Sequence, residues 1–141
     1  MIWNKKVTVD QINETCKNTM VEFLDIKITA IDDNELHAQM PVSDKVRQPF
    51  GIVHGGANCV LAETLGSLAA NFVVDYEKFH AVGLSINTSH IKAVRNGIVH
   101  ATAKAEHLGK TTHVWKIDTF NDNKALTSTT TLTMAIINRL K

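Results

Sequence analysis

Residues 55–74 read GGANCVLAETLGSLAANFVV, and this stretch decides the fold. It contains no proline and is rich in alanine and leucine, which favour a helical backbone. At roughly 1.5 Å per residue, a helix of this length extends for about 30 Å. Its side chains are apolar on nearly every side, so we expect a buried helix. Glu63 is the only acidic or basic residue within it.

The residues before this helix alternate between apolar and polar side chains in two short runs. Residues 24–31 and 35–40 both alternate, and Asp32-Asp33-Asn34 lies between them. Alternation on both sides of such a turn predicts an antiparallel hairpin. A capping-box pattern further upstream predicts a short helix over about residues 8–17, and residues 42–54 are expected to form a loop.

The residues after the helix have the character of a β meander. Turn residues interrupt them at intervals, and the last run is dense in β-branched residues, which favour strands. Four strands are expected, over residues 80–94, 97–107, 111–120 and 124–137. One long helix beside a six-stranded antiparallel sheet defines an α+β fold in which the sheet wraps around the helix. A single helix cannot cover the whole face of that sheet, so we expect subunits to pair.

The length and composition indicate a single domain over residues 1–141. A chain of 141 residues can bury roughly two-thirds of its unfolded surface, so it requires no disulfide or structural metal. Hydrophobic residues make up 44% of the chain and charged residues 21%, as in ordinary globular proteins. Lys and Arg number 15 against 14 Asp and Glu, a balance that argues against nucleic-acid binding.

Neither the cysteines nor the first residues indicate a metal, a redox centre or export. Cys16 and Cys59 lie far apart and match no metal-ligand or redox spacing. Residues 1–16 lack the apolar core of a secretory signal, and no run reaches the roughly 18 apolar residues of a membrane span. We therefore expect a cytoplasmic protein that does not associate with membranes.

The stretch that leads into the long helix carries the candidate chemistry. It reads Arg47-Gln48-Pro49-Phe50-Gly51-Ile52-Val53-His54-Gly55-Gly56. Glycines at a helix start allow close approach to the backbone, and the first N–H groups there are unpaired and positively polarised. Such donors suit a carbonyl oxygen that gains negative charge during acyl transfer. Glu63, about two turns further on, is expected in a dry pocket where desolvation makes it more basic, which completes a minimal set for ester or thioester hydrolysis.

Each of these residues also has a structural interpretation, and the sequence leaves both open. Gly55-Gly56 equally fits tight packing, and His54 fits a helix cap. Glu63 also fits a structural ion pair at a subunit interface, although charges are rarely buried without a partner or a use. Ser67, one turn beyond Glu63, either hydrogen-bonds the carboxylate or a water, or allows close helix packing.

Other catalytic patterns are missing from the sequence. No G-x-S-x-G elbow signals a Ser-His-Asp set. The seven histidines show no H-E-x-x-H or similar metal spacing, and no Gly-rich nucleotide loop occurs. The sequence therefore predicts no metal and no cofactor.

Several ordered segments resemble the hotdog-fold acyl-CoA thioesterases, most of all the branch that contains the 1,4-dihydroxy-2-naphthoyl-CoA hydrolases of menaquinone synthesis. The similar segments extend over nearly the whole chain: Met1-Ile2-Trp3, Met40-Pro41-Val42, Gln48 to Gly56, Leu61 to Ser67, Val82 to His90, Leu108-Gly109-Lys110 and Val114 to Ile117. The resemblance implies the hotdog fold, a long helix wrapped by a curved sheet. It also implies dimers with joined sheets that pair again into homotetramers, and active sites at the dimer interface.

The resemblance further implies roles for particular residues. Glu63 of one subunit would face Gly55 of the other, whose N–H polarises the thioester carbonyl while Gln48 positions it. His54 and Ser67 would shape or hydrate the site. Coenzyme A is part of the substrate here, not a cofactor, and its implied contacts are Gly83, His90, His107, Leu108, Gly109, Lys110, Thr111 and Thr112. Lys110 stands where arginine is frequent, and an ammonium is a point charge rather than a bidentate fork.

Hydrolysis of an aromatic acyl-CoA is the prediction, with several alternatives. The substrate could instead be another aryl- or acyl-CoA, or a misloaded acyl carrier protein. A hotdog dehydratase requires a second acid that the helix lacks, and an inactive acyl-CoA-binding domain would usually have lost Glu63 or Gly55-Gly56, which are both present. Whether Glu63 attacks the substrate directly or activates water stays open.

Overall fold

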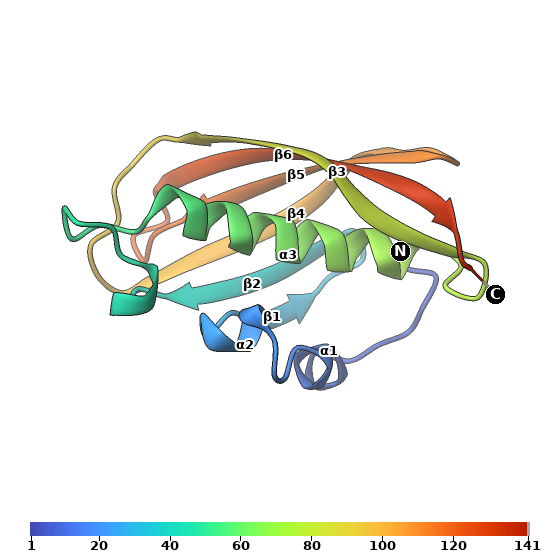
Figure 1. Ribbon diagram of the computed structural model, residues 1–141, viewed down its shortest axis with the longest axis horizontal. Coiled ribbons are helices and arrows are strands. Elements are labelled where there is room, and N and C mark those ends of the chain that lie inside the picture. The colour runs from blue at the N-terminus through green and yellow to red at the C-terminus, as the bar shows by residue number, and fades with distance from the viewer. Residues whose placement is uncertain (141) are drawn as a thin grey trace.

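The computed structural model describes residues 1–140 and confirms one long helix against a six-stranded antiparallel sheet (Figure 1). The elements are α1 (Val9–Thr15), α2 (Met20–Phe23), β1 (Lys27–Ile31), β2 (Glu35–Pro41), the 3-10 helix η1 (Asp44–Val46), α3 (Gly55–Val73), β3 (Phe79–His90), β4 (Ile98–Leu108), β5 (Thr112–Phe120) and β6 (Leu126–Asn138). The strands lie side by side in the order β1-β2-β4-β5-β6-β3. β3, although it follows α3 directly in the chain, therefore forms one edge of the sheet.

α3 lies across the inner face of the sheet and buries one of its own sides there (Figure 1). Leu61, Leu65 and Ala69 are fully buried on this side. They lie in one core with buried strand residues, which include Leu36, Met40, Val99, Ala103, Ile117, Leu132 and Met134. Gly66 brings the helix close to the sheet, because a Cβ at this position would lie 2.6 Å from Leu132 Cδ2.

The other side of α3 is not covered by the chain itself. Gly56 and Glu63 are exposed, and several neighbouring helix residues are only half-buried. The prediction of a helix buried on every side is therefore wrong for the single chain. None of the helices within residues 1–140 combines the length and apolarity that crossing a bilayer requires.

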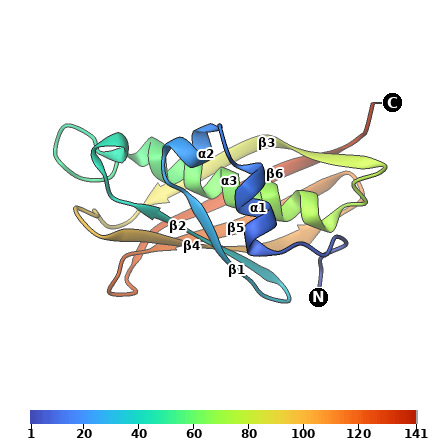
Figure 2. The same cartoon turned by 90° about the horizontal axis from the view of Figure 1, so that it is seen from below.

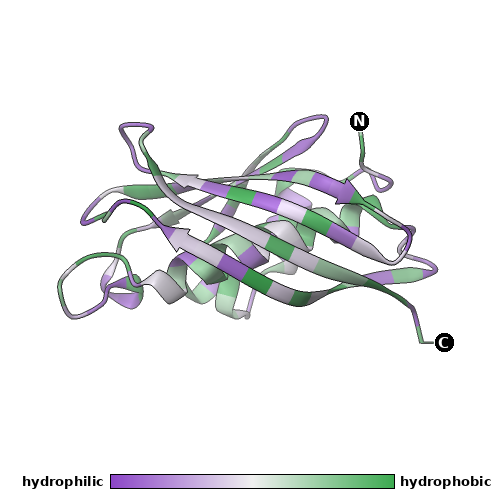
Figure 3. Cartoon of the chain, turned by 90° about the horizontal axis from the view of Figure 1, so that it is seen from above, coloured by the Kyte–Doolittle hydropathy of each residue, from purple (hydrophilic) through white to green (hydrophobic). Residues whose placement is uncertain are grey.

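The outer face of the sheet, away from α3, carries mixed and largely polar side chains. Figure 3, which views the molecule from above, shows hydrophilic and hydrophobic residues interspersed along the strands. In β2 every second residue is buried toward the helix and the residues between are only half-buried, which is the period of two expected for a strand with one covered face. The sheet thus has its hydrophobic core on the helix side.

The first residues of the chain pack beside α3 near β1 (Figure 2). The predicted capping box opens α1, with Thr8 Oγ1 accepting the Gln11 N–H at 3.2 Å. Asn13 fastens this helix to the sheet, because its side chain pairs with both the N–H and the carbonyl of Ile28. The short helix α2 was not predicted. It is a single turn capped by Thr19, too short to give a helical period in the sequence.

The remaining differences concern the ends of elements. The expected loop over residues 42–54 contains η1 and a bridge between Arg47 and Val53. β3 ends at His90, four residues earlier than predicted. The segment after it turns away, and the Val94 carbonyl instead accepts the Val53 N–H at 2.9 Å. This contact holds the residues that precede α3 in place.

Candidate active site

The turn before α3 fixes the side chain of Gln48. The Gly51 N–H donates to the Gln48 carbonyl at 2.9 Å, and Gly51 has φ +80°, a conformation that favours glycine. Gln48 Oε1 accepts a short hydrogen bond from the Phe50 N–H. Since the amide oxygen is engaged by its own turn, the amide NH₂ remains as a donor for another molecule.

His54 caps the start of α3. Its Nδ1 accepts the Gly56 N–H at 2.8 Å, which confirms the helix-cap interpretation. A neutral imidazole that accepts at Nδ1 carries its proton on Nε2. The exposed ring of His54 therefore presents an N–H donor at the same end of the helix as Gly55.

Gly55 is the first residue of α3, and the ring of His90 lies against it. A Cβ at Gly55 would lie 2.7 Å from His90 Nε2 and 3.0 Å from Cε1. The N–H of the first helical residue has no acceptor inside the helix, and no other acceptor is found among residues 1–140. The structure thus brings together an unpaired N–H, the Gln48 turn and His90.

Glu63 lies on the side of α3 that faces the edge strand β3. A Cβ at Gly83 would lie 2.6 Å from Glu63 Oε1, so the carboxylate rests directly on the backbone of that strand. Glu63 is exposed, which corrects the expectation of a dry pocket in the single chain. Within residues 1–140 its carboxylate forms no ion pair and no hydrogen bond, including none to Ser67, so no ion pair inside the chain explains its presence.

The two candidate catalytic groups are far apart in one chain. Gly55 and Glu63 are separated by eight residues, which corresponds to about 12 Å along the helix axis. One thioester carbonyl must place its oxygen roughly 3 Å from the N–H donor and its carbon within reach of the carboxylate or of a water beside it. The single chain therefore holds the two halves of a site without assembling them.

The residues implied to contact coenzyme A fall into two groups. Gly83 and His90 lie on β3, whereas residues 107–112 comprise the end of β4, the β4–β5 turn and the first residue of β5, near the C-terminal end of α3 (Figure 1). α3 has 19 residues and is about 28 Å long, so this turn is remote from Gly55 in the same chain. The turn is closed by a hydrogen bond from the Gly109 N–H to the Thr112 carbonyl at 2.9 Å, with Lys110 exposed.

His113, next to this turn, is buried, which disfavours its charged form. Burial lowers the pKa of His113, and the nearby His107 lowers it further. Its Nδ1 has no hydrogen-bond partner within residues 1–140. The cations available to a phosphate at this end of the molecule are therefore the exposed side chains, with Lys110 the foremost.

Asn58 is a buried polar residue near Gly55 that was not predicted. It is 7% exposed, and its Oδ1 has no hydrogen-bond partner among the described residues. An unpaired buried amide costs roughly 1–3 kcal/mol. Asn58 precedes the buried Leu61 by three residues and Leu65 by seven, so the helical period alone could have placed it on the sheet side.

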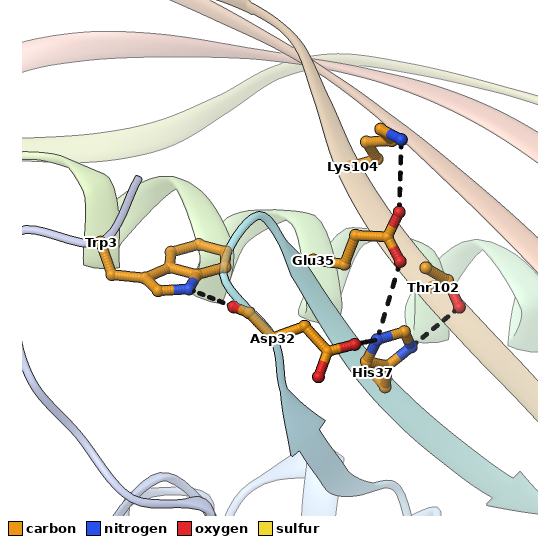
Figure 4. Close-up of polar contacts among 6 residues, drawn as sticks. All are labelled: Trp3, Asp32, Glu35, His37, Thr102 and Lys104. Atoms are coloured by element: carbon orange, nitrogen blue, oxygen red, sulfur yellow. Dashed lines mark hydrogen bonds and ion pairs between the residues drawn. The ribbon is translucent and has the colours of Figure 1, made fainter. Parts of the chain in front are cut away.

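A second polar cluster lies on the β1–β2 hairpin (Figure 4), at the opposite side of the sheet from β3. His37 Nε2 contacts Asp32 Oδ2 at 3.0 Å and Glu35 Oε2 at 3.8 Å, while its Nδ1 pairs with Thr102 at 3.0 Å. Lys104 pairs with Glu35 at 3.4 Å. Asp32, Glu35 and His37 have the donor types of a metal site, but each is already paired within the protein. The cluster is best explained as a structural network.

This network also holds the start of the chain. The indole N–H of Trp3 donates to the Asp32 carbonyl at 2.6 Å (Figure 4). The Trp3 ring stacks on Trp115, with ring centroids 6.3 Å apart and planes at 9°. Trp3 thereby ties the N-terminal residues to both the hairpin and the core.

Comparison with known proteins agrees with this fold. A model of the thioesterase superfamily matches residues 50–128, more than half of the chain, including the helix with Glu63. The chain belongs to the hotdog-fold thioesterase superfamily and is a thioester hydrolase.

Individual relatives are similar over almost their full length. The 1,4-dihydroxy-2-naphthoyl-CoA hydrolase of Escherichia coli is 42% identical, covering 97% of this chain and 100% of its own. A mutant of thioesterase PA1618 from Pseudomonas aeruginosa has 41% identity and a TM-score of 0.97, over 99% of this chain and 100% of its own. Thioesterase HI1161 from Haemophilus influenzae has 40% identity and the same TM-score of 0.97, over 100% of this chain and 98% of its own.

Proposed function

We propose that this thioesterase hydrolyses an aromatic acyl-coenzyme A, such as 1,4-dihydroxy-2-naphthoyl-CoA, to the free acid and coenzyme A. The name of the E. coli relative supports this substrate class. Thioesters of other aryl or acyl groups, and of acyl carrier protein, are the alternatives. The catalytic residues would be the same for all of them, because the acyl pocket determines which substrate is accepted.

The observation that carries the proposal is the position of Glu63 beside an unpaired sheet edge. β3 has no neighbour on its outer side, and its apolar Val82 and Leu84 are 41% and 66% exposed. Proteins rarely leave a long apolar edge strand uncovered. Antiparallel pairing of two β3 strands around a twofold axis would set the two α3 helices side by side in opposite directions. Glu63 of each chain would then approach Gly55 of the other and be shielded from bulk water.

The chemistry follows from these groups. The Gly55 N–H and the Gln48 amide NH₂ would hydrogen-bond the thioester carbonyl oxygen and stabilise the negative charge that develops on it. Glu63 would either attack the carbonyl carbon itself or take a proton from the attacking water. In both routes one water is consumed, the C–S bond breaks, the thiolate leaves and takes up one proton of the water, and the acyl group becomes a carboxylate as the other proton is released to solvent.

The same pairing would unite the two groups of predicted coenzyme A contacts. Because the helices run in opposite directions, the β4–β5 turn of one chain would lie toward the start of α3 in the other. Lys110 would then be available to the phosphates of a coenzyme A whose acyl end is at Gly55. His90, which lies against Gly55, would border the acyl end of the substrate rather than the nucleotide.

A panel of thioesters tests the substrate class. We expect kcat/KM for aromatic acyl-CoA substrates to exceed that for straight-chain acyl-CoA by roughly tenfold or more. A pocket shaped for one acyl group lowers kcat/KM by about this factor for a group that does not fit it. Release of free thiol provides the measurement. Faster hydrolysis of acyl carrier protein thioesters would favour the alternative donor, and equal rates for aromatic and aliphatic substrates would contradict the aromatic assignment.

A methyl group at Gly83 tests the placement of Glu63. We expect Gly83→Ala to lower kcat by about 10- to 100-fold, because displacing a catalytic group by about 1 Å has effects of this size. The new Cβ would take the place of the carboxylate, which can swing away without unfolding the protein. Ser85→Ala is the control for edge pairing, because a β-bulge between Gly83 and Ser85 places Ser85 on the opposite face of the same strand. If Gly83→Ala and Ser85→Ala lose kcat equally, or if subunit assembly changes, displacement of Glu63 is not the cause of the loss.

A further inference from the structure

α3 carries two asparagines whose side chains are in opposite hydrogen-bonding states. Asn71 is fully paired: its Oδ1 accepts the Ala81 N–H at 3.0 Å, and its Nδ2 donates to the Ala81 and Ser67 carbonyls, both at 2.9 Å. Asn58 is equally part of the folded helix, yet its buried Oδ1 has no partner within residues 1–140. Buried amides are nearly always paired, so the state of Asn58 requires an explanation.

Asn58 forms part of the wall of a cavity of about 240 Å³ at the start of α3. Gln48, Gly55 and His90 line the same cavity, and Lys92 also borders it. The rest of the wall is apolar, from Ile52, Val53, Ile91, Ala93 and Val94. At about 30 Å³ per water molecule, this volume has room for roughly eight waters, or for an acyl group of similar size. It is too small for coenzyme A.

The geometry of the bound thioester decides which part of the acyl group could reach Asn58. With the carbonyl oxygen on the Gly55 N–H, Asn58 follows three residues later, about 4.5 Å along the helix axis. A substituent on the ring carbon ortho to the thioester carbonyl lies within this range of the carbonyl oxygen. A substituent on the far side of an aromatic ring does not.

We infer that Asn58 is a specificity residue, whose amide hydrogen-bonds a hydroxyl or carbonyl oxygen adjacent to the thioester in the acyl group. The inference rests on the proposed function and deepens it. An amide both donates and accepts, and so does a hydroxyl. A site that pairs with a substrate hydroxyl rejects the analogue without it, because the buried group of the site is then left unpaired.

Three aromatic substrates test this inference: 2-hydroxybenzoyl-CoA, 4-hydroxybenzoyl-CoA and benzoyl-CoA. For Asn58→Leu, which has a similar shape and no hydrogen-bonding group, we expect the kcat/KM ratio of the 2-hydroxy to the unsubstituted substrate to fall at least tenfold from its wild-type value, as for loss of a paired hydroxyl. The 4-hydroxy to unsubstituted ratio should change by less than about twofold, since that hydroxyl is out of reach. Asn58→Ala gives the same readout if the leucine variant does not fold.

Thermal unfolding without substrate supplies a second readout. Asn58→Leu removes an unpaired buried amide and should raise Tm by about 2–4 °C, whereas Asn71→Leu removes three hydrogen bonds and should lower it by about 5 °C or more. The substrate ratios of Asn71→Leu should match those of the wild type. An unchanged 2-hydroxy ratio in Asn58→Leu, or an equal loss for all three substrates, would overturn the role of Asn58. Wild-type hydrolysis of these substrates that depends on Glu63 would leave the proposed function standing in either case.

Discussion

Replacing Glu63 with glutamine is expected to lower kcat by about 10²- to 10⁴-fold, the usual contribution of a carboxylate that acts as a base, and by at least as much if it attacks directly. Glutamine keeps the shape of the side chain but can neither attack the thioester nor take a proton from water. KM should change by only a few-fold, because the carboxylate acts on the transition state more than on the bound substrate. Steady-state release of coenzyme A from the best aromatic substrate provides the measurement.

The structure predicts that this loss comes without a loss of stability. Glu63 is exposed in the single chain and forms no ion pair or hydrogen bond within residues 1–140, so Tm of Glu63→Gln should lie within about 2 °C of the wild-type value. Glu14→Gln makes the same chemical change on α1, in an exposed pair with Lys17, and should leave kcat unaltered. A Glu63→Gln enzyme that retains most of its activity would show that the residue is structural.

The long helix and the sheet could be predicted from the sequence because their signals are local. α3 was expected over residues 55–74 and is observed over Gly55–Val73, since alanine, leucine and the lack of proline act within the helix itself. The strands likewise follow from alternation and turn residues. α2 escaped prediction because a single turn depends on its Thr19 cap and on tertiary packing, neither of which produces a repeating pattern.

The site was only partly predictable for a related reason. The turn around Gln48 and the glycines at the helix start are local motifs, so their residues could be named. The exposure of Glu63 could not, because an apolar helix indicates that its faces are covered without indicating whether the same chain or another one covers them. The positions of Gly83 under Glu63 and of His90 against Gly55 depend on β3 folding back to the sheet edge, a long-range pairing.

Loss of a single N–H at the start of α3 is expected to produce the second large effect. Gly55→Pro removes the proposed oxyanion donor and should lower kcat/KM by about 10²- to 10³-fold, as for other oxyanion-hole donors. Proline is well tolerated at the first helical position, where the N–H has no acceptor within the helix. The preceding residue must be extended, and His54 already is, with φ −63° and ψ 132°. The fold should therefore survive the change.

Gly55→Ala is the matched control for the proline variant. Both substitutions place a Cβ against the ring of His90, but alanine keeps the N–H. The difference in kcat/KM between the two variants therefore isolates the hydrogen-bond donor from the steric effect. If alanine and proline lower kcat/KM equally, close approach to the backbone is what the glycine provides, and the oxyanion role of its N–H would have to be abandoned.

Mixing the two inactive enzymes tests whether one site is built from two chains. In a dimer of one Glu63→Gln subunit and one Gly55→Pro subunit, one interface site would carry both defects and the other would be intact. Random pairing makes half of the dimers mixed, so the mixture should regain about one quarter of wild-type activity if the sites are shared across a twofold interface. Differently tagged subunits, purified in sequence, establish that the mixed dimer has formed. A mixed dimer with no recovered activity would show that Glu63 and Gly55 act within the same chain, which the roughly 12 Å between them along α3 argues against.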